Sequence, residues 1–98
     1  MLVHTVYFWL QPNLSDAERE RFRVELETLK KVSAAEAVYI GTPAATDRPV
    51  IDRSYDYGLT VLLKGMEQHD QYQVDEIHSE FVKNCSTLWE RVVIYDFM

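Results

Sequence analysis

Two side chains that can exchange protons, Tyr72 and His78, lie close together in a helix-like stretch of the sequence, residues 66–81. A free histidine has a pKa of about 6.5, so a neutral His78 can serve as a general base. A protonated Tyr72 can donate a hydrogen bond to an oxygen that gains negative charge. Together these groups suit proton removal next to a carbonyl group, followed by aldol closure or isomerisation.

Four further polar residues are predicted to face the same interior. Successive side chains alternate between the two faces of a strand, and this alternation puts on the helix-facing side His4, Glu36, Tyr57 and Asp96. An apolar core does not tolerate polar groups without partners, so these residues either bond to one another or line a pocket. Asp96 is expected to orient His78 or to hold His4, whereas Tyr57 and Glu36 are expected at the wall or rim.

The same histidines also have a purely structural interpretation. A histidine at the start of an apolar helical stripe, as His78 is, can be a core residue that bonds to a carboxylate or a carbonyl group. His4 can pair with Asp96 without taking part in chemistry. His69 is expected on the solvent-exposed side of its helix. The single cysteine, Cys85, lies on the apolar stripe and is expected to be a buried, unreactive residue.

The order of the predicted elements is βαββαβ. Strands are expected over residues 3–10, 35–41, 55–63 and 91–97, with a long loop over residues 42–54. The pattern Ser15-x-x-Glu18 is a capping box that begins a helix, which should run to about Lys31. A second helical region begins near Met66, pauses around residues 74–75, and continues as an apolar stripe made of His78, Phe81, Val82, Cys85, Leu88 and Trp89.

This order predicts an α+β, ferredoxin-like antiparallel sheet with both helices on one face. The other face would then carry a large uncovered set of apolar side chains, namely Tyr7, Trp9, Tyr39, Leu62, Val93, Tyr95 and Phe97. Such a face is not expected to remain in water. We therefore expect a homodimer in which two sheets pack face to face.

Length and charge limit the classes of partner. The chain has 98 residues, which corresponds to one domain, residues 1–98. Its net charge is −6 and it has no basic cluster beyond Lys30-Lys31, which argues against nucleic acid and anionic membranes as partners. No secretion signal or membrane-spanning run is recognised, so a cytoplasmic location is expected. No local metal-ligand spacing such as H-x-x-x-H is present, and neither a metal nor an organic cofactor is expected.

The arrangement of His4, Tyr72-x5-His78, Phe81 and Leu88-Trp89-Glu90 resembles the stress-responsive α/β-barrel (Dabb) family over nearly the whole chain. The resemblance implies a dimeric α+β barrel. It also implies an acid–base role for Tyr72 and His78, because a plant polyketide cyclase of this family uses a tyrosine and a histidine there. His4 matches a further pocket histidine. Two other histidines of that cyclase correspond to Tyr57 and Asp75, which implies a different substrate.

The function expected from the sequence is therefore that of a Dabb-domain protein with a pocket in each subunit. The pocket would bind a small carbonyl or phenolic compound, and Tyr72 and His78 would supply cofactor-free acid–base chemistry of a lyase, cyclase or isomerase. Two alternatives stay open. One is a stress-response or structural dimer without catalysis, and the other is a cofactor-free monooxygenase-like enzyme.

Overall fold

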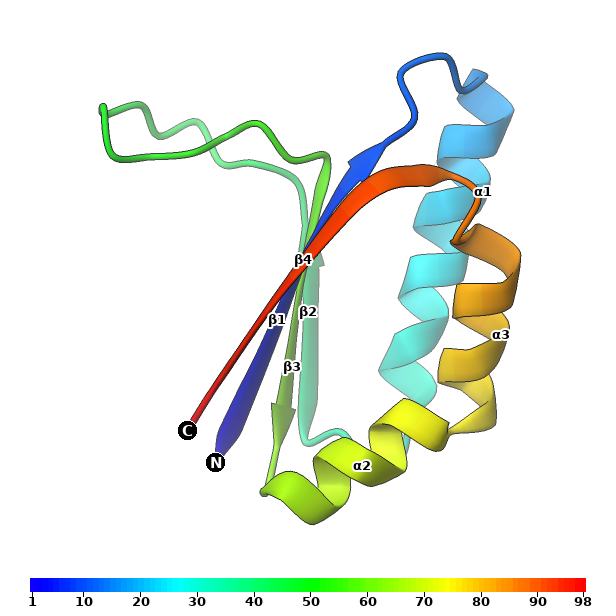
Figure 1. Ribbon diagram of the computed structural model, residues 1–98, viewed down its shortest axis with the longest axis vertical. Coiled ribbons are helices and arrows are strands. Elements are labelled where there is room, and N and C mark those ends of the chain that lie inside the picture. Colours follow the sequence, from blue (N-terminus) through cyan, green and yellow to red (C-terminus); the bar gives the residue numbers. More distant parts are fainter.

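The computed structural model describes residues 1–98, which form an antiparallel sheet with helices on one face (Figure 1). The elements are β1 (Leu2–Leu10), α1 (Asp16–Glu27), the 3-10 helix η1 (Thr28–Lys31), β2 (Ala37–Gly41), β3 (Tyr57–Leu63), α2 (Met66–Val74), α3 (Glu76–Cys85) and β4 (Trp89–Phe97). The strand order is β2-β3-β1-β4, and all neighbouring strands are antiparallel. The predicted ferredoxin-like βαββαβ fold is confirmed.

Strand β1 occupies the centre of the sheet, because it pairs with both β3 and β4. Its aromatic and β-branched residues favour extended backbone. Buried and half-buried side chains alternate along its full length, and the buried ones are Leu2, His4, Val6, Phe8 and Leu10. The apolar core therefore lies between the sheet and the helices, and His4 is the polar residue buried within it.

Helix α1 begins at the predicted capping box. The Glu18 backbone N–H donates to Ser15 Oγ at 3.1 Å, and the Ser15 backbone N–H donates to Glu18 Oε1 at 2.9 Å. These two bonds satisfy backbone groups that the first helical turn leaves without partners. Two apolar residues of the helix, Phe22 and Leu26, are completely buried against the sheet.

The second helical region is divided into two helices at Asp75, where a pause was predicted. Asp75 has an extended backbone conformation, and its carboxylate accepts a hydrogen bond from the Ile77 backbone N–H at 2.8 Å. It thus ends α2 and caps α3. Phe81 and Cys85 of α3 are buried as expected. The expectation that Val82 is also in the core is wrong, since its side chain is 38% exposed. Consecutive helical residues point in different directions, so Val82 faces away from the core that Phe81 enters.

The connection between β2 and β3, residues 42–56, lies on the side of the sheet away from the helices (Figure 1). The predicted third strand starts too early, since Tyr55 belongs to this loop. Its ring packs against Tyr7 at a centroid distance of 4.9 Å, on the face opposite Tyr57. Asp56 holds the end of the loop beside β1, because its carboxylate accepts a hydrogen bond from the Leu10 backbone N–H at 2.7 Å.

The sheet face without helices, called here the open face, carries large aromatic side chains. The pairs Val3–Phe97, Thr5–Tyr95 and Tyr7–Val93 stand opposite one another across β1 and β4. Tyr39, Tyr95 and Phe97 are 62%, 61% and 59% exposed, respectively. The predicted uncovered apolar face is therefore present in the single chain. None of the helices has both the length and the apolar character needed to cross a bilayer.

The Cys85 thiol should be unreactive in the folded protein. Cys85 has no exposed surface, and burial, together with the nearby Glu25 carboxylate, raises its pKa to about 11 from a usual 9.0. A thiol reagent at pH 8 should label it only after unfolding, because the thiolate is the reactive form. The unfolded thiol ionises first as pH rises through about 9, so its ionisation should lower stability above that pH. Rapid labelling of the native protein would contradict this assignment.

Candidate functional site

A row of polar side chains crosses the core from β4 to α3. At one end, the neighbouring strands β1 and β4 place His4 directly opposite Asp96. His4 Nδ1 donates a hydrogen bond to Asp96 Oδ1, and the two atoms are 2.5 Å apart. The carboxylate therefore fixes the ring of a histidine that is only 2% exposed. Of the two alternatives for Asp96, the structure shows that it holds His4.

Tyr72 is the next member of the row and comes from α2. It is completely buried, with its ring centroid 5.6 Å from that of His4 and 4.9 Å from that of His78. Its hydroxyl group has no hydrogen-bond partner. Burial, and secondarily the Asp75 carboxylate, raises the pKa of Tyr72 well above its usual value. The hydroxyl thus keeps its proton and remains a hydrogen-bond donor.

His78 ends the row, in the first turn of α3. Burial lowers its pKa from the usual 6.5, and the nearby His4 lowers it further. The Gln73 backbone carbonyl and the Asp75 carboxylate act in the opposite direction but do not reverse the shift. The imidazole is therefore neutral near pH 7 and has a free lone pair, which is the state that a general base requires.

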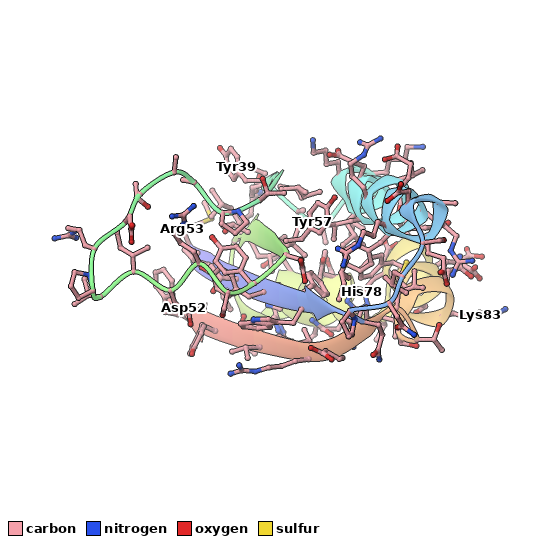
Figure 2. The ribbon with its side chains drawn as sticks, turned by 90° about the horizontal axis from the view of Figure 1, so that it is seen from above. Tyr39, Asp52, Arg53, Tyr57, His78 and Lys83 are labelled. Carbon is pink, nitrogen blue, oxygen red and sulfur yellow. The ribbon has the colours of Figure 1, made fainter.

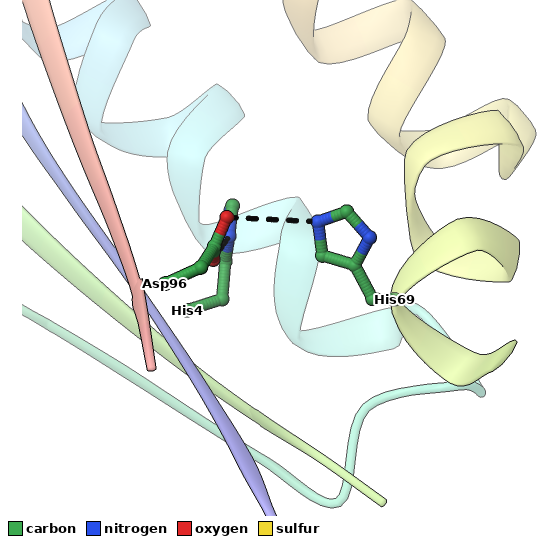
Figure 3. A group of neighbouring side chains, drawn as sticks. All are labelled: His4, His69 and Asp96. Atoms are coloured by element: carbon green, nitrogen blue, oxygen red, sulfur yellow. Dashed lines mark hydrogen bonds and ion pairs between the residues drawn. The ribbon is translucent and has the colours of Figure 1, made fainter. Parts of the chain in front are cut away.

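The expectation for His69 is wrong, because this residue faces the interior rather than solvent. Its side chain is 18% exposed, and its Nε2 lies 3.8 Å from Asp96 Oδ2 (Figure 3). His69 precedes Tyr72 by three residues on α2, and residues with this spacing share a helix face. That spacing is the sequence signal that could have placed His69 beside Tyr72.

Two predicted site residues do not join this row. Tyr57 stands opposite Phe8 on the sheet and packs on Phe22 at a centroid distance of 5.4 Å. It is thus four residues along the sheet from His4, a separation of about 13 Å. Glu36 lies near the sheet edge, where its carboxylate is 3.4 Å from the Lys64 ammonium group. Figure 2 shows Tyr57 and His78 among the side chains on the helix side, with Asp52 and Arg53 on the loop at the other side.

The surface of the protein has three hollows, and none of them is lined by Tyr72 or His78. One hollow of about 310 Å³ lies on the open face, beneath the loop that follows β2, and is lined by Tyr7, Trp9, Asp52, Tyr55, Arg91, Val93 and Tyr95. The sequence did not predict this hollow, since its lining comes from segments that meet only in the folded chain.

Comparison with known proteins identifies the family. The sequence matches the Stress responsive A/B Barrel Domain (Dabb) family over residues 2–98. The chain therefore belongs to the Dabb family, as its resemblance implied. None of the curated proteins matches the chain significantly.

Solved structures show the same fold at low sequence identity. A Dabb-family protein with a ferredoxin-like fold from Mesorhizobium loti is 21% identical, with a TM-score of 0.79 over 99% of this chain and 94% of its own. A dimeric ferredoxin-like protein of unknown function from Thermobifida fusca is 16% identical, with a TM-score of 0.79 over 98% and 88%. The hydroxynitrile lyase of Passiflora edulis is 15% identical, with a TM-score of 0.78 over 98% and 90%. The last similarity shows a shared fold with an enzyme.

Replacing Tyr72 with Phe should preserve or increase the stability of the free protein. A buried hydroxyl without a partner costs about 1–3 kcal/mol, and phenylalanine keeps the shape of the ring. We expect the melting temperature of Tyr72→Phe to equal or exceed that of the wild type. Tyr57→Phe is the matched control, because Tyr57 is only partly buried and can meet water. A clear fall in the stability of Tyr72→Phe would mean that the hydroxyl has a partner.

Proposed function

We propose that this Dabb protein binds a small carbonyl or phenolic compound beside Tyr72 and His78, and that the two residues move a proton on it. The observation that carries the proposal is the buried Tyr72 hydroxyl, which has no partner. An oxygen atom of the compound supplies the missing acceptor. Binding then removes an energetic cost that the free protein carries.

The states of the two residues define their roles. The lone pair of the neutral His78 removes a proton from the carbon next to the carbonyl group. The electrons of that C–H bond move onto the carbonyl oxygen, and the Tyr72 O–H donates a hydrogen bond to the resulting enolate. Aldol closure or isomerisation follows, and the protonated His78 returns its proton to the product.

Access to Tyr72 requires local movement, because none of the three hollows reaches it. The break between α2 and α3 at Asp75 is the part of the helical layer that is best suited to move. There the backbone is extended, and one side-chain hydrogen bond, from the Ile77 N–H to the carboxylate, caps the next helix. The hydroxynitrile lyase with this fold supports the proposal only in that the fold can carry an enzyme.

A thermal-shift screen tests this function with phenols, β-diketones and short acyl-CoA analogues as probes. A bound compound raises the melting temperature in a concentration-dependent manner. We expect His78→Ala and Tyr72→Phe to reduce or abolish the shift, whereas Tyr57→Phe should retain it. A compound that stabilises all four proteins equally binds elsewhere. A lower melting temperature for His78→Ala, with no response of the wild type to any probe, would assign His78 a structural role only.

We also propose that two chains associate through their open faces to form a homodimer. The supporting features are the exposed aromatic side chains and the loop that projects from this side (Figure 1). The proposed interface includes Tyr7, Trp9, Tyr39, Val93, Tyr95 and Phe97. The dimeric protein from Thermobifida fusca with this fold is consistent with such an assembly. A dimer that works through its own surface, without chemistry, is the second candidate function.

Replacing Tyr95 with Lys should separate the dimer. A lysine places a charge within the proposed apolar interface. Sedimentation equilibrium should give the mass of two chains for the wild type and of one chain for Tyr95→Lys. Val24→Lys is the control, because Val24 is 50% exposed on α1, outside the open face. A monomeric wild type, or an unchanged mass for Tyr95→Lys, would contradict the proposed interface.

A further inference from the structure

Three potential metal ligands meet beside the polar row. His4 comes from β1, Asp96 from β4 and His69 from α2, and Figure 3 shows His69 facing the other two. One ligand atom of each residue lies within 4.8 Å of the corresponding atoms of the other two. The rings of His4 and His69 are in edge-to-face contact, with centroids 5.7 Å apart. These residues are distant in sequence, so no local ligand-spacing motif reveals them.

The hydrogen bonds of His69 orient one of its nitrogens toward Asp96. His69 Nδ1 lies 3.1 Å from Asp70 Oδ1, and a carboxylate can only accept a hydrogen bond, so Nδ1 carries the proton. In the neutral ring, Nε2 then has a lone pair. This nitrogen faces Asp96 Oδ2 at 3.8 Å, which is too long for a hydrogen bond. Two electron-rich atoms thus face each other across a gap that suits a cation.

We propose that His4, His69 and Asp96 form a binding site for a divalent transition-metal ion such as Zn²⁺. Two imidazoles and one carboxylate are a ligand set that such ions use with further positions open. Mg²⁺ and Ca²⁺ prefer oxygen ligands, so they fit this site poorly. The Asp70 carboxylate orients His69 as carboxylates commonly orient metal-bound histidines.

For His4 Nδ1 to bind an ion, the proton that it donates to Asp96 in the free protein must move to Nε2, and the three side chains must move slightly. Ligands bonded to Zn²⁺ at about 2.0–2.1 Å in a tetrahedron lie about 3.4 Å from one another. In the protein, His4 Nδ1 lies 2.5 Å from Asp96 Oδ1 and His69 Nε2 lies 3.8 Å from Asp96 Oδ2. One ligand atom from each of the three residues lies within 4.8 Å of the others, so a movement of about 1 Å brings them to the tetrahedral spacing. The Asp96 side chain is 40% exposed, so it can turn and the ion remains accessible to water or a ligand.

The metal site is distinct from the pair that carries the proposed function. His78 is not a ligand, and Tyr72 lies between it and His4. The charge of the site favours a cation, because the carboxylates of Asp96 and Asp70 lie next to the two imidazole rings. Metal binding can therefore be measured without knowledge of any organic substrate. If no metal binds, the proposal that Tyr72 and His78 transfer a proton is not affected.

Isothermal titration of the chelator-treated, untagged protein with Zn²⁺ tests the site. We expect one ion per chain and a higher melting temperature with Zn²⁺ than without it. His69→Leu and Asp96→Asn should each weaken Zn²⁺ binding by more than about 100-fold, above the range for residues that only orient a ligand. Asp70→Ala should weaken binding about tenfold or more, because it removes the acceptor that orients His69.

His78→Ala is the matched control. The protein has three histidines, and His78 is the one outside the proposed ligand set, so this variant should bind Zn²⁺ as the wild type does. Circular dichroism of each variant verifies that it is folded. Co²⁺ in place of Zn²⁺ should give visible absorption that disappears in His69→Leu. Equal Zn²⁺ affinity in the wild type and His69→Leu, or no binding by the wild type, would overturn the proposal and leave Asp96 as the hydrogen-bond acceptor of His4.

Discussion

Both faces of the central strand β1 carry side chains that must be kept out of water, and the arrangement of the whole chain follows from this constraint. The helices cover one face, where Leu2, Val6 and Phe8 are buried. On the other face, the loop after β2 covers part of β1 through the packing of Tyr55 on Tyr7. The aromatic residues of β4 on that face remain exposed in the single chain. A second copy of the chain is the simplest cover for them.

The same constraint gives the polar row its properties. A core that excludes water strengthens every hydrogen bond within it and makes a missing partner costly. His4 has the Asp96 carboxylate as its partner, and burial keeps His78 neutral. The Tyr72 hydroxyl has no partner, and its cost of about 1–3 kcal/mol is offset by the burial of neighbouring apolar side chains, each worth about 1.5–3 kcal/mol.

His4 links the two sites proposed in this molecule. On one side it lies beside Tyr72, which contacts His78, and on the other it is bonded to Asp96, which His69 approaches. A cation bound by His4 and Asp96 would place positive charge near the Tyr72 ring, whose centroid is 5.6 Å from that of His4. The two sites share no residue, although His4 is close to both.

The amino-acid sequence was sufficient to predict the order of the elements, the capping box of α1, the break near Asp75 and the uncovered aromatic face. These features depend on local backbone preferences and on whether apolar residues recur every two or every 3.6 positions. Both can be read from residues that are neighbours in the sequence. It also indicated the Tyr72 and His78 pair, through family resemblance and helix spacing. Only the tertiary structure decided that Asp96 holds His4, that His69 turns inward, and that Glu36 and Tyr57 lie apart from the row. The register of β1 against β4 places His4 opposite Asp96, and such a contact depends on residues far apart in sequence.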